Sequence, residues 1–130
     1  MEKPKYVQGS INWRDLTTYK ADELREFYQS VAGWTSQGLD MKDGENAYQD
    51  YVMKDAKGNS VAGICHSRGA NTGVPPQWVA YISVENVDES VENALKLGGK
   101  LLKEYKSKEG TLFYAMIEDP AGAVFALAKI

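Results

Sequence analysis

The chain contains two copies of one pattern, and this duplication restricts its fold more than any other feature. The stretch 21–33 is echoed by 87–99, because each has an Asp-Glu pair at its start and ends on glycine, 66 positions apart. The turn-forming segment 55–58 is echoed by 119–122, 64 positions later, and both lead into short apolar runs. Two related supersecondary units are therefore expected to build the molecule together.

Each copy is expected to fold as βαβββ. Alternating residues predict a strand over 10–18, and apolar residues at helical spacing predict a helix over 19–32. The helical residues expected to face the core are Leu24, Phe27, Tyr28 and Val31. The other predicted elements are strands over 46–54, 60–66, 79–84, 101–105, 112–117 and 123–128, and a helix over 87–97.

Size and composition predict one soluble, cytoplasmic domain. The 130 residues correspond to a single domain, with repeats at about 10–66 and 78–129 joined by a Gly- and Pro-containing linker at 67–77. The net charge of −3, without a basic stripe, argues against nucleic-acid binding. No apolar run approaches the roughly 20 residues that span a bilayer, and residues 1–6 show no signal peptide. The single cysteine, Cys65, fits a reducing compartment.

Several motifs resemble those of a known superfamily. They are Trp13-Arg14-Asp15-Leu16-Thr17-Thr18, Phe27-Tyr28 before Ala32-Gly33-Trp34, Val61-Ala62-Gly63-Ile64, Pro75-Pro76-Gln77-Trp78 and Asp119-Pro120-Ala121-Gly122-Ala123-Val124-Phe125. With the duplicated layout, they make residues 10–129 resemble the vicinal oxygen chelate superfamily, which includes glyoxalase I, bleomycin resistance proteins and extradiol dioxygenases. This resemblance implies an α+β fold in which two βαβββ modules pair into a curved eight-stranded mixed sheet, and often a homodimer.

The resemblance also implies where a metal would bind. In metal-using members, His, Gln or Glu on the first and last strands of each module hold a divalent ion. Counting from the motifs places these positions at Trp13, Ala62, Val79 and Ala126. None of these side chains offers the oxygen or imidazole donor that such an ion needs, so we expect no metal and no cofactor.

Strand parity nominates the residues of a ligand site, because side chains two positions apart share a face. Trp13 is expected to share its face with Asp15 and Thr17. Ala62 is expected to bring Ile64 and His66 into a cavity and to send Cys65 to the opposite face, so a Cys-His nucleophile pair is not expected. The predicted ligand-binding residues are Trp13, Thr17, Tyr48, Asp50, Tyr81, Ser83, Tyr114 and Met116, and the candidate catalytic residues are Asp15 and His66.

The chemistry of these residues leaves alternatives open. Asp15, beside an indole, could serve as a base or bind a cation, or it could hydrogen-bond structurally. His66 is the single histidine, the residue type whose unperturbed pKa lies near neutrality, but a solvated surface role is equally consistent. The aromatic members of the set favour flat or cationic organic ligands, although core packing uses the same residue types.

Three functions follow. The first is metal-independent binding of a small organic molecule in an aromatic-lined cleft, in which Asp15 and Asp50 hold a cationic group if one is present. The second is a glyoxalase-like lyase or isomerase that uses Asp15 or His66 as its base. The third is a non-catalytic structural or accessory dimer.

Overall fold

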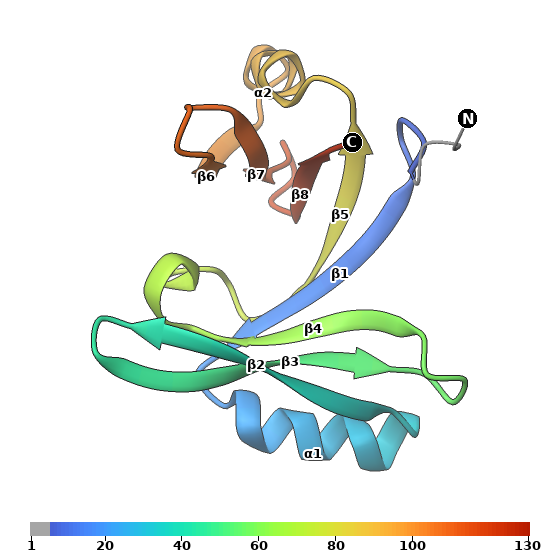
Figure 1. The fold of residues 1–130 in the computed structure, drawn as a ribbon. Helices are drawn as coiled ribbons and strands as arrows, with labels where there is room; N and C mark the ends of the chain where they lie inside the picture. The colour runs from blue at the N-terminus through green and yellow to red at the C-terminus, as the bar shows by residue number, and fades with distance from the viewer. Residues whose placement is uncertain (1–5) are drawn as a thin grey trace, which may run out of the picture. The chain divides into compact units, whose positions relative to one another are not determined.

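The computed structural model describes residues 6–130, so the expectation about the N-terminus falls largely outside the described residues. The eight strands of this range form one mixed sheet in the hydrogen-bonded order β2-β3-β4-β1-β5-β8-β7-β6, which confirms the α+β prediction. Figure 1 labels the strands and the helices α1 and α2. The elements in chain order are β1 (Ile11–Thr18), α1 (Ala21–Ala32), β2 (Thr35–Asp43), β3 (Asn46–Lys54), β4 (Ser60–His66), the 3₁₀ turn η1 (Gly69–Asn71), β5 (Trp78–Val84), α2 (Val87–Lys96), β6 (Lys100–Lys106), β7 (Leu112–Glu118) and β8 (Val124–Lys129).

The chain divides into two compact units, and the boundary falls within β1. The first unit is Arg14–Trp78, and the second unit contains the residues up to Trp13 together with Val79–Ile130. In the first unit, β1 pairs in parallel with β4, while β3 pairs antiparallel with β4 and β2. In the second unit, β5 pairs in parallel with β8, and β7 pairs antiparallel with β8 and β6. The two units therefore repeat one pairing pattern.

In the first unit, α1 covers the sheet through the start of the helix. Its Ala21 is fully buried in a core cluster with Tyr51, Met53, Ala62 and Ile64. At the other end of the helix, Tyr28, Trp34 and Trp78 pack around one another. The indole nitrogen of Trp78 donates a hydrogen bond of 3.1 Å to the Tyr28 hydroxyl.

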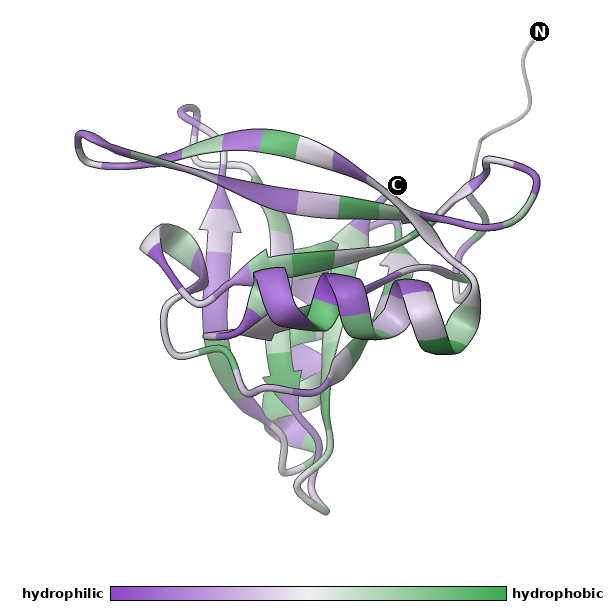
Figure 2. Cartoon of the chain, turned by 90° about the horizontal axis from the view of Figure 1, so that it is seen from below, coloured by the Kyte–Doolittle hydropathy of each residue, from purple (hydrophilic) through white to green (hydrophobic). Residues whose placement is uncertain are grey.

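The predicted apolar stripe of α1 faces the core only in part. Phe27 is 51% exposed and Val31 is 67% exposed, which corrects the expectation that both are buried. The guanidinium of Arg25 instead lies 4.8 Å from the centre of the Tyr51 ring, so the helix turns this polar position toward the sheet. Figure 2 shows hydrophobic and hydrophilic segments side by side along α1.

In the second unit, α2 buries more apolar side chains against the sheet than α1 does in the first unit. Val87 and Val91 of this helix are buried in a cluster with Val84, Ile117 and other strand residues. The Asn86 side chain accepts a hydrogen bond of 3.0 Å from the Glu89 backbone N–H, which is the usual N-terminal cap of a helix. Neither helix in residues 6–130 is long and apolar enough to cross a membrane.

A β-bulge in β4 makes the strand register of the first unit differ from that of the second unit. In the first unit, Met53 pairs with Ala62 but Lys54 pairs with Ser60, so β4 holds one extra residue between them. The corresponding pairs in the second unit, between 117–118 and 124–125, show no such shift. Because a bulge inserts one unpaired residue, it changes which side chains face each side of the following strand.

Candidate functional site

The bulge corrects one sequence expectation about β4. Ala62 and Ile64 pack in the core cluster that includes Ala21 of α1, so they do not face a cavity on the other side of the sheet. Cys65 pairs with Thr17 and therefore lies on the same side of the sheet as Thr17. The strand pattern predicts Ala62 on that side. Parity counting failed because it assumed an uninterrupted strand.

The bulge also changes which residue of β4 corresponds to one of the four expected metal positions. Asp15 pairs with Gly63, just as Tyr81 of the second unit pairs with Ala126, so Gly63 and not Ala62 corresponds to Ala126. Glycine offers no side-chain donor, and the residues at the family's metal positions do not fit a metal ion. Within residues 6–130, no three His, Cys, Asp or Glu side chains are grouped as a metal site would require.

On the first unit, the side of the sheet away from α1 carries polar groups. We call this the α1-free face, defined by Asp15, Thr17, Tyr48, Asp50 and Cys65 of β1, β3 and β4. Thr17 and Asp50 are each only 4% exposed. Buried polar side chains of this kind require hydrogen-bond partners, and Asp50 has several.

Asp50 is the centre of this polar network. Its Oδ1 accepts a hydrogen bond of 2.8 Å from the His66 backbone N–H and lies 3.2 Å from the His66 Nδ1. Because a carboxylate oxygen only accepts, Nδ1 is the donor in this contact. Asp50 therefore orients the imidazole.

The other ring nitrogen of His66, Nε2, faces the first turn of α1. Its Nε2 lies 3.6 Å from Oδ1 of Asp22, a carboxylate that also accepts the Tyr51 hydroxyl. Burial, followed by the Asp22 hydrogen bond, raises the pKa of Tyr51 above its ordinary value. His66 thus lies between a buried carboxylate, Asp50, and an exposed one, Asp22.

The segment after β4 covers Tyr48. The Arg68 guanidinium lies 4.2 Å from the centre of the Tyr48 ring, and Arg68 Nε is 3.5 Å from an Asp43 carboxylate oxygen. The His66 ring meets the Tyr48 ring edge to face, with centres 5.4 Å apart. Burial and then the neighbouring Asp50 charge raise the pKa of Tyr48.

The surroundings of Cys65 disfavour its thiolate form. Burial raises the pKa of its thiol far above the ordinary value, and the charges of Asp15 and Asp50 raise it further. A protonated thiol is a poor nucleophile. That Cys65 takes no part in nucleophilic chemistry stays a prediction, and Cys65 lies on the opposite face from the one expected.

On the second unit, the side of the sheet away from α2 is aromatic. We call this the α2-free face, defined by Tyr81, Ser83, Lys103, Tyr105, Tyr114 and Met116. One row of cross-strand partners runs from Lys103 through Met116 and Ala126 to Tyr81. The next row runs from Tyr105 through Tyr114 and Ala128 to Ser83. Opposed residues share a face, so the two rows are side by side.

The tyrosine rings of this face contact one another above small residues. The Tyr81 and Tyr114 rings meet edge to face with centres 5.7 Å apart, and the Tyr105 and Tyr114 centres are 6.1 Å apart. Ala126 and Ala128 beneath them are buried, whereas Tyr114 is 45% exposed. The small methyl groups leave room for the rings, which present aromatic surface outward.

The structure thus divides the predicted site residues into two groups. Asp15, Thr17, Tyr48, Asp50 and His66 belong to the first unit, and Trp13, Tyr81, Ser83, Tyr114 and Met116 belong to the second. Sequence reasoning missed Asp22, Tyr51 and Arg68 around His66, and Asn12, whose amide donates to the Ser83 hydroxyl. The acidic first turn of α1 was the available signal for Asp22.

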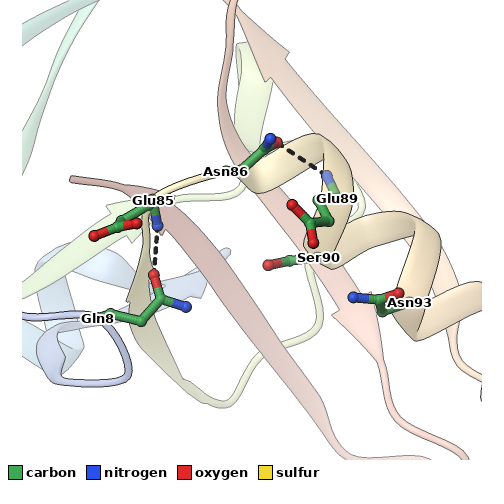
Figure 3. Close-up of a pocket in the computed structure, with 6 residues that line it drawn as sticks. All are labelled: Gln8, Glu85, Asn86, Glu89, Ser90 and Asn93. Atoms are coloured by element: carbon green, nitrogen blue, oxygen red, sulfur yellow. Dashed lines mark hydrogen bonds between the residues drawn. The ribbon is translucent and has the colours of Figure 1, made fainter.

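A separate polar pocket opens at the start of α2 in the second unit. It has a volume of about 280 Å³ and is drawn in Figure 3. Its lining residues are Gln8, Glu85, Asn86, Glu89, Ser90 and Asn93. The Gln8 and Asn86 side chains there accept hydrogen bonds from the backbone N–H groups of Glu85 and Glu89. The pocket contains none of the predicted site residues.

Known proteins resemble this chain over nearly its whole length. "Putative glyoxylase CFP32" of Mycobacterium tuberculosis is 32% identical over 127 residues, covering 97% of this chain and 48% of that protein. "Anthracycline biosynthesis protein DauV" of Streptomyces sp. strain C5 is 29% identical, covering 95% of this chain and 42% of that protein. The chain therefore spans about half the length of the curated relatives that it matches.

Solved structures of low sequence identity share the fold. A methylmalonyl-CoA epimerase of Streptomyces coelicolor matches with a TM-score of 0.54 and 12% identity, covering 95% of this chain and 98% of the other. The hypothetical protein BH1468 of Bacillus halodurans matches with a TM-score of 0.58 and 9% identity, covering 95% and 96%. The family model of glyoxalase-like domains matches residues 14–128. The chain therefore belongs to the glyoxalase-like domain family of the vicinal oxygen chelate superfamily.

Proposed function

We propose that this domain binds a small, flat organic molecule on the α2-free face without the help of a metal ion. The observation that carries this proposal is the layer of contacting tyrosines over buried alanines, with Tyr114 45% exposed. Exposed aromatic faces gain most from stacking against another flat ring system. The metal positions of the family, at Trp13, Gly63, Val79 and Ala126, provide no donors in support of metal chemistry.

The names of two relatives are consistent with a flat ligand. DauV and "Anthracycline biosynthesis protein DnrV" of Streptomyces peucetius are named for anthracycline biosynthesis, and they are 29% and 22% identical to this chain. Anthracyclines are planar, fused-ring molecules. A tyrosine-lined face suits that class of ligand.

The test is a fluorescence titration with 2-naphthol, an uncharged flat probe, in the presence of EDTA. Tyr114→Ala is expected to weaken binding about tenfold, because stacking on one aromatic ring contributes about 1–3 kcal/mol. Tyr19→Ala is the matched control, since Tyr19 is 82% exposed and lies in the first unit. Equal affinities of the two variants, or binding that EDTA abolishes, would refute the proposal. Native mass spectrometry of the purified protein would show subunit number and any retained molecule, which tests the expected homodimer.

A second candidate is proton transfer by His66, in a lyase or isomerase reaction. It is favoured by the 3.2 Å contact between His66 Nδ1 and Asp50, since a carboxylate that orients imidazole leaves Nε2 to act as a base. Asp15, the other predicted base, is half-buried on the same unit.

The proton-transfer candidate has its own test. Structural neighbours include a methylmalonyl-CoA epimerase in complex with methylmalonyl-CoA, so this thioester is a suitable probe. Deuterium uptake from D₂O at its acidic carbon is expected with the unmodified protein and not with His66→Gln. Uptake that survives in His66→Gln but not in Asp15→Asn would assign the base to Asp15, and no uptake with the unmodified protein would remove this candidate for that substrate class.

A further inference from the structure

The two edges of the sheet differ in how well they are protected against pairing with another strand. Within residues 6–130, β2 forms one edge of the sheet and β6 forms the other. An edge strand presents a row of backbone N–H and C=O groups to which a further strand can bind, and proteins commonly block this row with lysines, bulges or proline. The residues and the register of each edge strand therefore show whether it is open to docking.

The β6 edge is protected in two ways. Three of its seven residues are lysines, and its pairing with β7 shifts register at two places. Lysine side chains resist the approach of another strand, and irregular register bends the edge away from a straight partner. These features make β6 a poor docking edge.

The β2 edge is regular instead. It forms a long hairpin with β3 (Figure 1), in which nine consecutive residue pairs, from Thr35–Lys54 to Asp43–Asn46, run without a register shift. The strand contains no proline and one lysine, and six of its nine residues are exposed. A regular, exposed edge of this length can exchange backbone hydrogen bonds with an added strand.

The charges of β2 suit a second copy of the same strand. Asp40 and Lys42 flank Met41, and both are exposed. They share one face, because side chains two positions apart point to the same side of a strand. When two β2 strands lie antiparallel with Met41 opposite Met41, Asp40 of each copy lies opposite Lys42 of the other. Opposed unlike charges stabilise a strand pair, and this arrangement places no two like charges directly opposite each other.

We propose that β2 is the contact edge of a homodimer, in which the β2 strands of two copies pair antiparallel about Met41 and continue the sheet from one molecule into the next. The two copies are related by a two-fold axis, so each one supplies both an aspartate and a lysine to the contact. This proposal goes beyond ligand binding, because it names an interaction surface that belongs to the first unit alone. It holds whether or not the α2-free face binds a ligand.

Sedimentation velocity of charge variants tests the proposal. The unmodified protein is expected to sediment as a dimer, at twice its mass of 14.4 kDa. Asp40→Lys opposes two lysines at each of the two contacts, and Lys42→Asp opposes two aspartates. Each variant is expected to dimerise about tenfold more weakly, since one exposed charge pair changes affinity only a few-fold and two pairs change from attraction to repulsion. The double variant, with both substitutions, restores unlike charges and should regain the original affinity.

A mixture of the two single variants gives the sharpest measurement. A heterodimer of Asp40→Lys with Lys42→Asp again has lysine opposite aspartate at both contacts, so the mixture should contain more dimer than either variant alone. That recovery would also show that both variants fold. Lys57→Asp is the matched control, because it makes the same charge change at an exposed residue between β3 and β4, and it should leave dimerisation unchanged.

Three outcomes would overturn the proposal. A monomeric unmodified protein would leave the β2 edge to an extended segment of another protein. Single variants that dimerise as well as Lys57→Asp would place the dimer contact on another surface. A mixture that dimerises no better than its components would show that Asp40 and Lys42 do not face each other across the contact.

Discussion

The two units of this molecule share one topology but differ in what their sheets carry on the side away from the helix. In the first unit, that side holds the carboxylate of Asp50, which is 4% exposed. One of its oxygens accepts hydrogen bonds from the backbone and the ring of His66. In the second unit, it holds mutually contacting tyrosines, with Tyr114 45% exposed. A duplicated backbone therefore determines where side chains lie, while their identity decides whether a face is polar and hydrogen-bonded or aromatic.

The largest effect on stability is expected at Asp50. Asp50→Ala removes the acceptor of the His66 N–H and ring while these donors remain buried, and it should lower the free energy of unfolding by about 3 kcal/mol. Asp40→Ala, which breaks one exposed bond of 3.0 Å to Gln49, should change it by less than about 0.5 kcal/mol. Urea unfolding at pH 7 measures both. Similar losses would mean that the first unit's polar face is not structural.

The helices offer a second comparison. Val91 of α2 is 7% exposed and Val31 of α1 is 67% exposed. Val91→Ala should cost about 2 kcal/mol, since about 0.8 kcal/mol is lost per buried methylene and a small cavity adds to it. Val31→Ala should cost less than about 0.5 kcal/mol. Equal costs would show that α1 is covered by something on its apolar side.

A smaller difference is expected at the helix starts. Asn86→Ala should destabilise the protein by about 1 kcal/mol, because its side chain caps α2. The residue at the equivalent place in α1, Lys20, makes no side-chain cap, so Lys20→Ala should have almost no effect. Thermal unfolding of both variants measures the difference, and a loss in Lys20→Ala would contradict it.

The smallest expected effect concerns pH and Cys65. Because the folded protein raises the pKa of the Cys65 thiol, the unfolded chain loses its proton first as pH rises. The thiol's contribution to stability is present below the ordinary pKa of about 8.5 and is lost gradually above it. Labelling of native protein by Ellman's reagent at pH 8.5 should accordingly be much slower than labelling in urea. Fast native labelling would mean that the thiol is not held protonated.

The sequence predicted the element order well where periodicity was uninterrupted. The helix predicted over 87–97 is observed as Val87–Lys96, and the strand predicted over 112–117 as Leu112–Glu118. The bounds of β2, Thr35–Asp43, were missed, since this strand is mostly exposed and lacks an apolar alternation. Half-exposed edge strands carry little of the hydrophobic pattern on which such predictions depend.

The predicted faces of β4 were wrong because one residue is inserted there. The bulge beside Ala62 places Ala62 and Ile64 on the side of α1 and Cys65 on the other side. The faces of Tyr81, Ser83, Tyr114 and Met116 agree with the parity argument, because the β5, β7 and β8 pairings are regular there. Sequence spacing does not reveal a bulge, because the position of a bulge depends on how the strand pairs with its neighbour.

The division of β1 has a practical consequence for cutting and rejoining the chain. Residues up to Trp13 belong to the second unit and residues from Arg14 to the first, so the polypeptide passes between the units twice. A single proteolytic nick in segment 67–77 would leave residues 14–66 joined through β1 to residues 11–13 of the second unit, while 79–130 would become a separate fragment. New termini for a circular permutant are therefore best tried in that segment, where β1 still joins the two units.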